Sequence, residues 1–380
     1  MIQITDDNRS NCCGCTACKN VCPKQAISML PDQEGFLTPV IDSGLCINCG
    51  LCDKVCPMKQ SDKLEFKCRD NVYVGALKDP QELTKSQSGG AFWALAKGVI
   101  QNKGVVYGCG YKDHFVAAHK RAETVEQCEE FRGSKYVQSD LGDCFLQIKE
   151  DLQAGKCVLF SGTPCQCAGL QFYLRKKYEN LIVCDIVCHG VPTPLLTEKY
   201  IAESEKRYKD KVVGFNYRYY DGVSLTWGRP LEKIDFSRGN SVLATKLSNL
   251  FYSHAFLRRS CNVCPFGSKA TSDVTIADAW GCKDYAPGIK KIDYGVSEIL
   301  IHSKKEQIYG MLTGSMNLVK VNYDDILRYQ PCLTKPIEAS SNREKYMKMF
   351  LKKGALYTHK RMTQRTRVKE ILLKLIGKSK

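Results

Sequence analysis

From residue 72 onward, short apolar runs alternate with amphipathic stretches. The apolar runs predict strands, and the helical spacing of Phe92, Leu95, Ala96 and Val99 predicts an amphipathic helix. Strands are predicted at 73–77, 104–111, 115–122, 158–160, 181–187, 211–220, 229–236, 274–280, 295–303 and 317–323. Helices are predicted at 86–102, 124–131, 140–155, 248–260, 305–312 and 323–331, and others begin at Pro164 and just beyond Pro194. This order predicts a mixed α/β body.

The stretch from residue 157 to residue 190 has the order strand, turn, helix, strand. Gly162 and Thr163 turn the chain after the first apolar run, and Pro164 takes the first helical position. The two strands are therefore expected to be parallel, joined by a right-handed crossover. Because ligands of such sheets bind at the carboxyl ends of the strands, the Gly162–Thr163 turn and residues 188–190 are expected at a binding edge.

The first 60 residues carry two cysteine ladders of identical spacing, C-x2-C-x2-C-x3-C, each followed by proline. Two copies of this spacing predict a bacterial ferredoxin-like domain with two [4Fe-4S] clusters, in which the fourth cysteine of each ladder binds the other cluster. Zinc knuckles, the alternative, usually use cysteine pairs at wider separation. Cys13 fits neither set. One cluster is thus assigned to Cys12, Cys15, Cys18 and Cys56, and the other to Cys46, Cys49, Cys52 and Cys22.

The composition bears on the cellular compartment and on the kind of partner. The 22 cysteines could indicate a secreted disulfide scaffold, but the N-terminus lacks a signal-peptide pattern, and no apolar run is long enough to predict a membrane span. We therefore expect a cytoplasmic protein with reduced thiols. The formal net charge of +16 overstates the basicity, because each cluster with its thiolates adds about two negative charges. The basic C-terminal tail could meet an acidic partner, an anionic membrane or nucleic acid, or form a solvated helical face, and nucleic-acid binding is not expected.

Other residues suggest further sites. Cys165 begins the helix after Thr163, Cys188 ends the next strand, and Cys261 and Cys264 form a C-x2-C pair, so these four could hold a third cluster. The alternatives are a buried thiol at Cys188 and a structural zinc site at the pair. Ser88, Gly89 and Gly90 open a helix in a way that suits phosphate, although many helices begin so. His189 could donate a proton to a reduced flavin, or be a structural histidine.

Several ordered segments resemble the coenzyme F420 hydrogenase/dehydrogenase beta-subunit family. They are GSKYVQSDLG (133–142), LFSGTPCQCAGL (159–170), VCDIVCHGVPTP (183–194), the Cys261–Cys264 pair and TSDVTIADAWG (271–281). The resemblance covers about residues 70 to 310. It implies bound FAD with Ser88, Gly89, Gly90, Lys135, Gly162 and Thr163 near the flavin, and an additional [4Fe-4S] cluster on Cys165, Cys188, Cys261 and Cys264. Ala277, Ala279 and Lys269 depart from the family pattern, so the use of coenzyme F420 itself stays open.

We therefore expect a multidomain protein of the α+β or α/β class, in which a two-cluster ferredoxin-like domain precedes a mixed α/β flavin-binding domain. The expected parts are a ferredoxin-type domain at 1–65, a polar linker after Cys56, a flavin oxidoreductase domain in two parts at 70–190 and 191–335, and a basic helical tail at 336–380.

The resemblance implies an FAD- and [4Fe-4S]-dependent oxidoreductase. It would relay electrons between a small-molecule hydride donor or acceptor, such as coenzyme F420, and ferredoxin or another redox protein or subunit. The alternatives are a non-catalytic electron-transfer subunit of a larger complex and a ferredoxin-dependent reductase of a biosynthetic metabolite.

Overall fold

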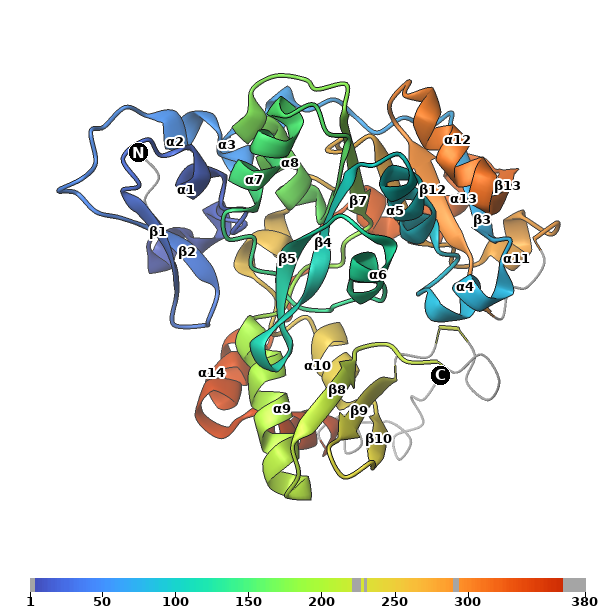
Figure 1. Cartoon of the computed structure of the whole chain (residues 1–380). Coiled ribbons are helices and arrows are strands. Elements are labelled where there is room, and N and C mark those ends of the chain that lie inside the picture. The colour runs from blue at the N-terminus through green and yellow to red at the C-terminus, as the bar shows by residue number, and fades with distance from the viewer. Residues whose placement is uncertain (1–3, 221–226, 229–230, 290–293, 365–380) are drawn as a thin grey trace.

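The computed structural model describes residues 4–220, 227–228, 231–289 and 294–364. Its centre is an eight-stranded mixed sheet (Figure 1). In spatial order its strands are β13 (Met316–Lys320), β3 (Val72–Leu77), β12 (Ser297–Ile301), β11 (Val274–Asp278), β7 (Leu181–Ile186), β6 (Val158–Gly162), β4 (Val105–Lys112) and β5 (Val116–Ala122). The four strands β4, β6, β7 and β11 are mutually parallel. The predicted mixed α/β body and the parallel pairing of β6 with β7 are thus confirmed.

Helices cover both faces of this sheet. Leu159 of β6 packs with Trp93 and Leu95 of α5 (Ala91–Gln101), on the face that α12 (Glu306–Ser315) also covers. Its neighbours Val158 and Phe160 pack on the opposite face, against α7 (Cys144–Gln153) and α8 (Pro164–Leu174). Because successive side chains of a strand point to opposite faces, a continuous apolar run is what a sheet buried on both sides requires.

A second unit packs below this sheet in Figure 1. It contains an antiparallel sheet of β8 (Val212–Asn216), β9 (Glu232–Phe236) and β10 (Ser241–Ala244), together with α9 (Pro194–Tyr208), α10 (Lys246–Tyr252) and α14 (Arg343–Lys353). The predicted helix over 248–260 is wrong in its second half. The helix ends at Tyr252, because His254 adopts a left-handed backbone with φ +55°, and a 3-10 turn at Arg259–Val263 carries Cys261 instead. Within the predicted basic tail, 365–380 lie outside the described residues.

The N-terminal region packs against α7 and α8. It contains α1 (Ala17–Val21), the hairpin β1 (Ile27–Pro31) and β2 (Leu37–Ile41), α2 (Leu51–Lys54) and α3 (Pro57–Gln60). The polar stretch after Cys56 is not a free linker. Lys67 donates its main-chain N–H to Ser268, and Ala270 donates to Glu65, so the stretch is tied to the segment before β11.

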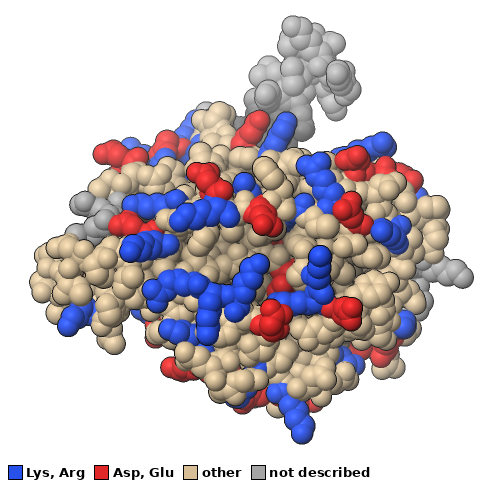
Figure 2. Space-filling view, turned by 90° about the horizontal axis from the view of Figure 1, so that it is seen from above, with Lys and Arg blue, Asp and Glu red and all other residues tan. Residues whose placement is uncertain are grey.

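The remaining described helices are short: α4 (Pro80–Lys85), α6 (Val125–Cys128), α11 (Cys282–Tyr285) and α13 (Tyr323–Leu327), and residues 355–364 are also helical. No described helix has both the length and the apolar character needed to cross a membrane. On the face shown in Figure 2, lysine and arginine side chains are interspersed with aspartate and glutamate. The excess of basic residues therefore does not form a surface of a single sign on that face.

Candidate redox site

The structure groups the eight ladder cysteines in the crossed pattern. Cys18 is buried, and its pKa is raised by that burial and then by the negative charges of Cys12 and Cys56. Cys15 is likewise within the electrostatic reach of Cys18 and Cys56. The other four cysteines line one cavity of about 310 Å³: Cys22, Cys46, Cys49 and Cys52. Each group thus takes three cysteines from one ladder and the last cysteine from the other.

Both ladders use the same backbone bends. Gly14 and Asn48, each two residues after the first cysteine, have φ of +69° and +53°, and Thr16 and Gly50, each four residues after it, have φ of +62° and +69°. A left-handed residue at these two positions curls the loop, so that its three cysteines face one centre. Glycine is therefore not required at either position for the bend alone, since Asn48 and Thr16 adopt it too.

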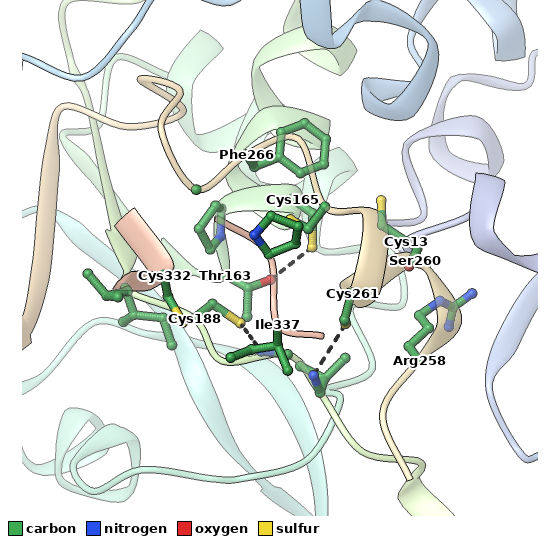
Figure 3. A pocket seen from close by; sticks show the side chains of 18 of the residues that line it. Cys13, Thr163, Cys165, Cys188, Arg258, Ser260, Cys261, Phe266, Cys332 and Ile337 are labelled. Atoms are coloured by element: carbon green, nitrogen blue, oxygen red, sulfur yellow. Dashed lines mark hydrogen bonds between the residues drawn. The ribbon is translucent and has the colours of Figure 1, made fainter. Parts of the chain in front are cut away.

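A second set of four cysteines meets at a cavity of about 50 Å³ (Figure 3). Cys165 comes from the first turn of α8, Cys188 follows β7, and Cys261 and Cys264 come from the 3-10 turn and its end. Cys13 and Cys332 also line this cavity. Burial raises the pKa of Cys261 and of Cys264 to about 12. These thiols therefore need a metal to hold them as thiolates.

Hydrogen bonding to Cys13 and burial raise the pKa of the Cys165 thiol well above its ordinary value.

The hydrogen bonds to sulfur separate the predicted ligands from other cysteines. Backbone N–H groups donate to the sulfurs of Cys12, Cys22, Cys188 and Cys261, from Gly14, Ala26, Gly190 and Val191 at 3.3–3.4 Å. Sulfur in these bonds is an acceptor, as a thiolate ligand is. Three cysteines outside the predicted sets do the opposite and donate to carbonyl oxygens: Cys109, Cys167 and Cys184. The Cys46 sulfur lies 3.8 Å from the Asn48 side-chain oxygen, and exchange of the amide atoms would make that sulfur an acceptor too.

These cysteines therefore fit iron–sulfur clusters in donor type and in hydrogen bonding. Among the described residues, no three His, Cys, Asp or Glu side chains converge on a point that could hold a single metal ion. A cubane is bound differently, because each of its irons takes one cysteine and the four sulfurs stay apart.

A cavity of about 300 Å³, called the larger cavity to distinguish it from the one of about 50 Å³, lies at the carboxyl ends of β6, β7 and β11 and beside the middle of β4. Among the residues predicted near the flavin, Ser88, Gly90, Lys135, Gly162 and Thr163 line it, and so does His189. Gly89 does not line it. A Cβ at Gly89 would lie 2.1 Å from the Gly75 carbonyl oxygen, so this glycine lets the backbone pack on β3.

The ionisable groups of this cavity have pKa values shifted by burial or are paired with specific partners. Lys135 donates to the main-chain oxygens of Glu130 and Arg132, and burial lowers its pKa to about 8. Burial also lowers the pKa of His189. Asp278 pairs with Arg218 at 2.5 Å. The cavity thus offers cations and a carboxylate around an otherwise apolar space, which is typical of a cofactor site.

The two cavities share a wall. Thr163, Ile186, Val187, Cys188, Gly190 and Val191 line both of them. On the other side of the smaller cavity, the Cys13 thiol interacts with those of both Cys15 of the first ladder and Cys165. The sequence missed Cys13 because it stands outside both ladders, and it offered no signal for Arg258, which also lines the smaller cavity.

Comparisons with known proteins agree with two parts of this arrangement. Residues 155–309 match the family model for the C terminus of the coenzyme F420 hydrogenase/dehydrogenase beta subunit, and residues 11–60 match a 4Fe-4S dicluster domain. A chain of the xenon-derivatized F420-reducing [NiFe] hydrogenase complex from Methanosarcina barkeri is similar in structure, with a TM-score of 0.45 and 17% sequence identity over 80% of this chain and 93% of that chain. No curated protein sequence is significantly similar.

Proposed function

We propose that this chain relays electrons between two kinds of partner. Its sequence matches a 4Fe-4S dicluster domain and the C terminus of the coenzyme F420 hydrogenase/dehydrogenase beta subunit. One partner is a small-molecule hydride donor or acceptor such as coenzyme F420. The other is a one-electron carrier such as ferredoxin, or a redox subunit. FAD and three [4Fe-4S] clusters are the proposed cofactors, because a flavin exchanges electron pairs with hydride substrates and single electrons with clusters.

The adjacency of the candidate sites is the observation that carries this proposal. The four cysteines Cys165, Cys188, Cys261 and Cys264 lie between the first ladder and the larger cavity. Cys188 belongs to the wall of both cavities, and Cys165 reaches the first ladder through Cys13. A relay needs neighbouring redox sites, and this order supplies them without a gap.

The larger cavity suits FAD through its polar groups. Lys135 and the start of α5 after Gly90 supply positive charge and N–H donors for a pyrophosphate. His189 lies at the wall that faces the four cysteines, and its lowered pKa keeps the imidazole neutral near neutral pH. A neutral imidazole can accept a proton, so His189 is the proposed group that takes up the proton released on substrate oxidation, and its lowered pKa favours passing that proton on.

The second ladder suits exchange with a protein partner. Cys49 is exposed, and so are the neighbouring apolar side chains of Leu45 and Ile47. Exposed apolar residues beside a candidate cluster form a small, dry contact for a one-electron carrier.

Anaerobic purification with iron, sulfide and flavin quantification tests the proposal, followed by titration with reduced coenzyme F420 and with ferredoxin. We expect about twelve irons and one FAD per chain. Lys135→Met is expected to lower the flavin content, whereas Lys120→Met is not, because Lys120 is exposed and pairs with Glu130. Wild-type protein without flavin, or with about eight irons or fewer after reconstitution, would contradict this relay.

A further inference from the structure

Arg258 is a buried cation that lacks a carboxylate partner among the described residues. It is 3% exposed. Its Nε donates to the Cys12 carbonyl oxygen at 2.7 Å, one terminal nitrogen donates to Gln138 Oε1 at 2.8 Å, and the other to the Leu37 carbonyl oxygen at 2.9 Å. All three acceptors are neutral. Burying an unpaired charge is costly, so the folded protein is expected to place negative charge near this guanidinium.

Two sets of predicted ligands supply that charge. The second terminal nitrogen of Arg258 lies 3.4 Å from the Cys12 sulfur of the first ladder. Arg258 also lines the cavity of the four other cysteines, Cys165, Cys188, Cys261 and Cys264. Figure 3 shows Arg258 beside Cys261, on the side of the cavity where Cys13 lies. The guanidinium thus stands between the two sets.

The first ladder is shaped to admit this side chain. A Cβ at Gly14 would lie 2.4 Å from Gln138 Nε2 and 2.9 Å from an Arg258 terminal nitrogen. The equivalent position of the second ladder carries Asn48, whose backbone has the same left-handed bend. Glycine at position 14 is therefore explained by the approach of Gln138 and Arg258.

We propose that Arg258 is a positioning residue that acts as the shared counter-charge of two clusters, the one on Cys12, Cys15, Cys18 and Cys56 and the one on Cys165, Cys188, Cys261 and Cys264. A fixed positive charge stabilises the more negative, reduced form of a cluster, so Arg258 raises the reduction potential of both. The same charge has a smaller effect on the reduction potential of the cluster of the second ladder. This inference rests on the proposed function, because it requires the third cluster.

The test is a potentiometric titration of the whole holoprotein followed by EPR, with iron counted in the same samples. In Arg258→Met, the equilibrium constant for one-electron reduction is expected to fall about tenfold at two clusters, equal to about 59 mV, and to stay unchanged at the second-ladder cluster. Arg258→Lys keeps the charge and is expected to restore much of the shift. The matched control is Arg259→Met, since Arg259 is 35% exposed and pairs with Glu34 and Glu344, and it is expected to leave all three potentials unchanged.

Gln138→Glu provides a second route that keeps Arg258 in place. A carboxylate at 138 would neutralise the guanidinium on the spot, and the same two potentials are expected to fall. A shift at neither cluster, at only one, or equally at all three in a protein with twelve irons overturns the role of Arg258 and leaves the proposed relay standing. A wild-type protein that holds only eight irons instead removes the third cluster, and both proposals fall with it.

Discussion

Glu298 of β12 is a buried carboxyl group with an unusual proton affinity. It is fully buried, and neither carboxyl oxygen accepts a hydrogen bond from any described residue. Gln330 lies nearby and favours the carboxylate, but its amide donates to the main-chain oxygen of Asp278. Burial therefore dominates and raises the pKa of Glu298 from 4.5 to about 8. The folded protein holds a proton there that the unfolded chain has already released.

The sign and size of the effect on stability follow from this difference. Between the two pKa values the folded state binds more protons, so the free energy of unfolding falls as pH rises. The slope is about 1.4 kcal/mol per pH unit near pH 6 and falls to about half of that at the folded pKa of about 8, so the loss is about 2 kcal/mol from about pH 6 to about pH 8. Glu298→Gln removes this dependence. For 380 residues the unfolding entropy is about 0.8 kcal/mol per kelvin, so the variant should gain about 3 °C on the wild type over that range.

Thermal unfolding at one scan rate, without oxygen, at the two pH values measures the effect. Glu232→Gln is the control, because Glu232 is equally buried but accepts hydrogen bonds from Tyr200, Leu247 and Ser248. This variant is expected to be less stable than the wild type at both pH values. A difference between Glu298→Gln and wild type that is the same at both pH values would refute the reasoning.

Three further changes test the ladders, the attachment of the N-terminal region and the exposed contact. Cys56→Ser and Cys15→Ser should each remove about four irons, and both should abolish the same EPR signal. If Cys56→Ser instead abolished the same signal as Cys49→Ser, the crossed assignment would be wrong. Arg343→Met breaks a buried pair with Glu34 and should cost about 3–5 kcal/mol, seen as a lower thermal midpoint, whereas Glu344→Gln, whose side chain is 73% exposed, should change little. Ile47→Asp should slow reduction by ferredoxin while flavin reduction by a small hydride donor keeps its rate; equal slowing of both would argue against a separate docking contact.

Much of the sheet was predictable because its signals are local. The apolar run before Gly162 and the Thr163–Pro164 start of α8 each lie within a few residues, and the structure bears them out. The failure at 248–260 has a local cause that the apolar spacing hides, namely the left-handed backbone at His254. The hairpin β1–β2 was not predicted, because its burial does not alternate and each strand contains a proline, Pro31 or Pro39, so the local sequence gives no clear strand signal.

Part of the candidate site could likewise be predicted from local sequence, and part of it could not. Ladder spacing is a local signal, so the eight cysteines could be assigned to two groups from sequence. The contact of Cys13 with Cys165 and the approach of Arg258 to Gly14 join segments far apart in the chain, and nothing in the local sequence indicates them.

The turn between β6 and α8 borders both cavities. The kind of metal centre held by Cys165, Cys188, Cys261 and Cys264 would therefore determine whether electrons can pass between the larger cavity and the ladders. Thr163 caps α8 and lines both cavities, and its hydroxyl lies 3.2 Å from the Cys165 sulfur. A shift of this turn would move one wall of the larger cavity together with Cys165 of the smaller cavity. With a redox-active cluster at the four cysteines, the turn joins the larger cavity to the ladders. With zinc, which has no redox chemistry, the same residues would separate them, and the two ends of the molecule could not exchange electrons.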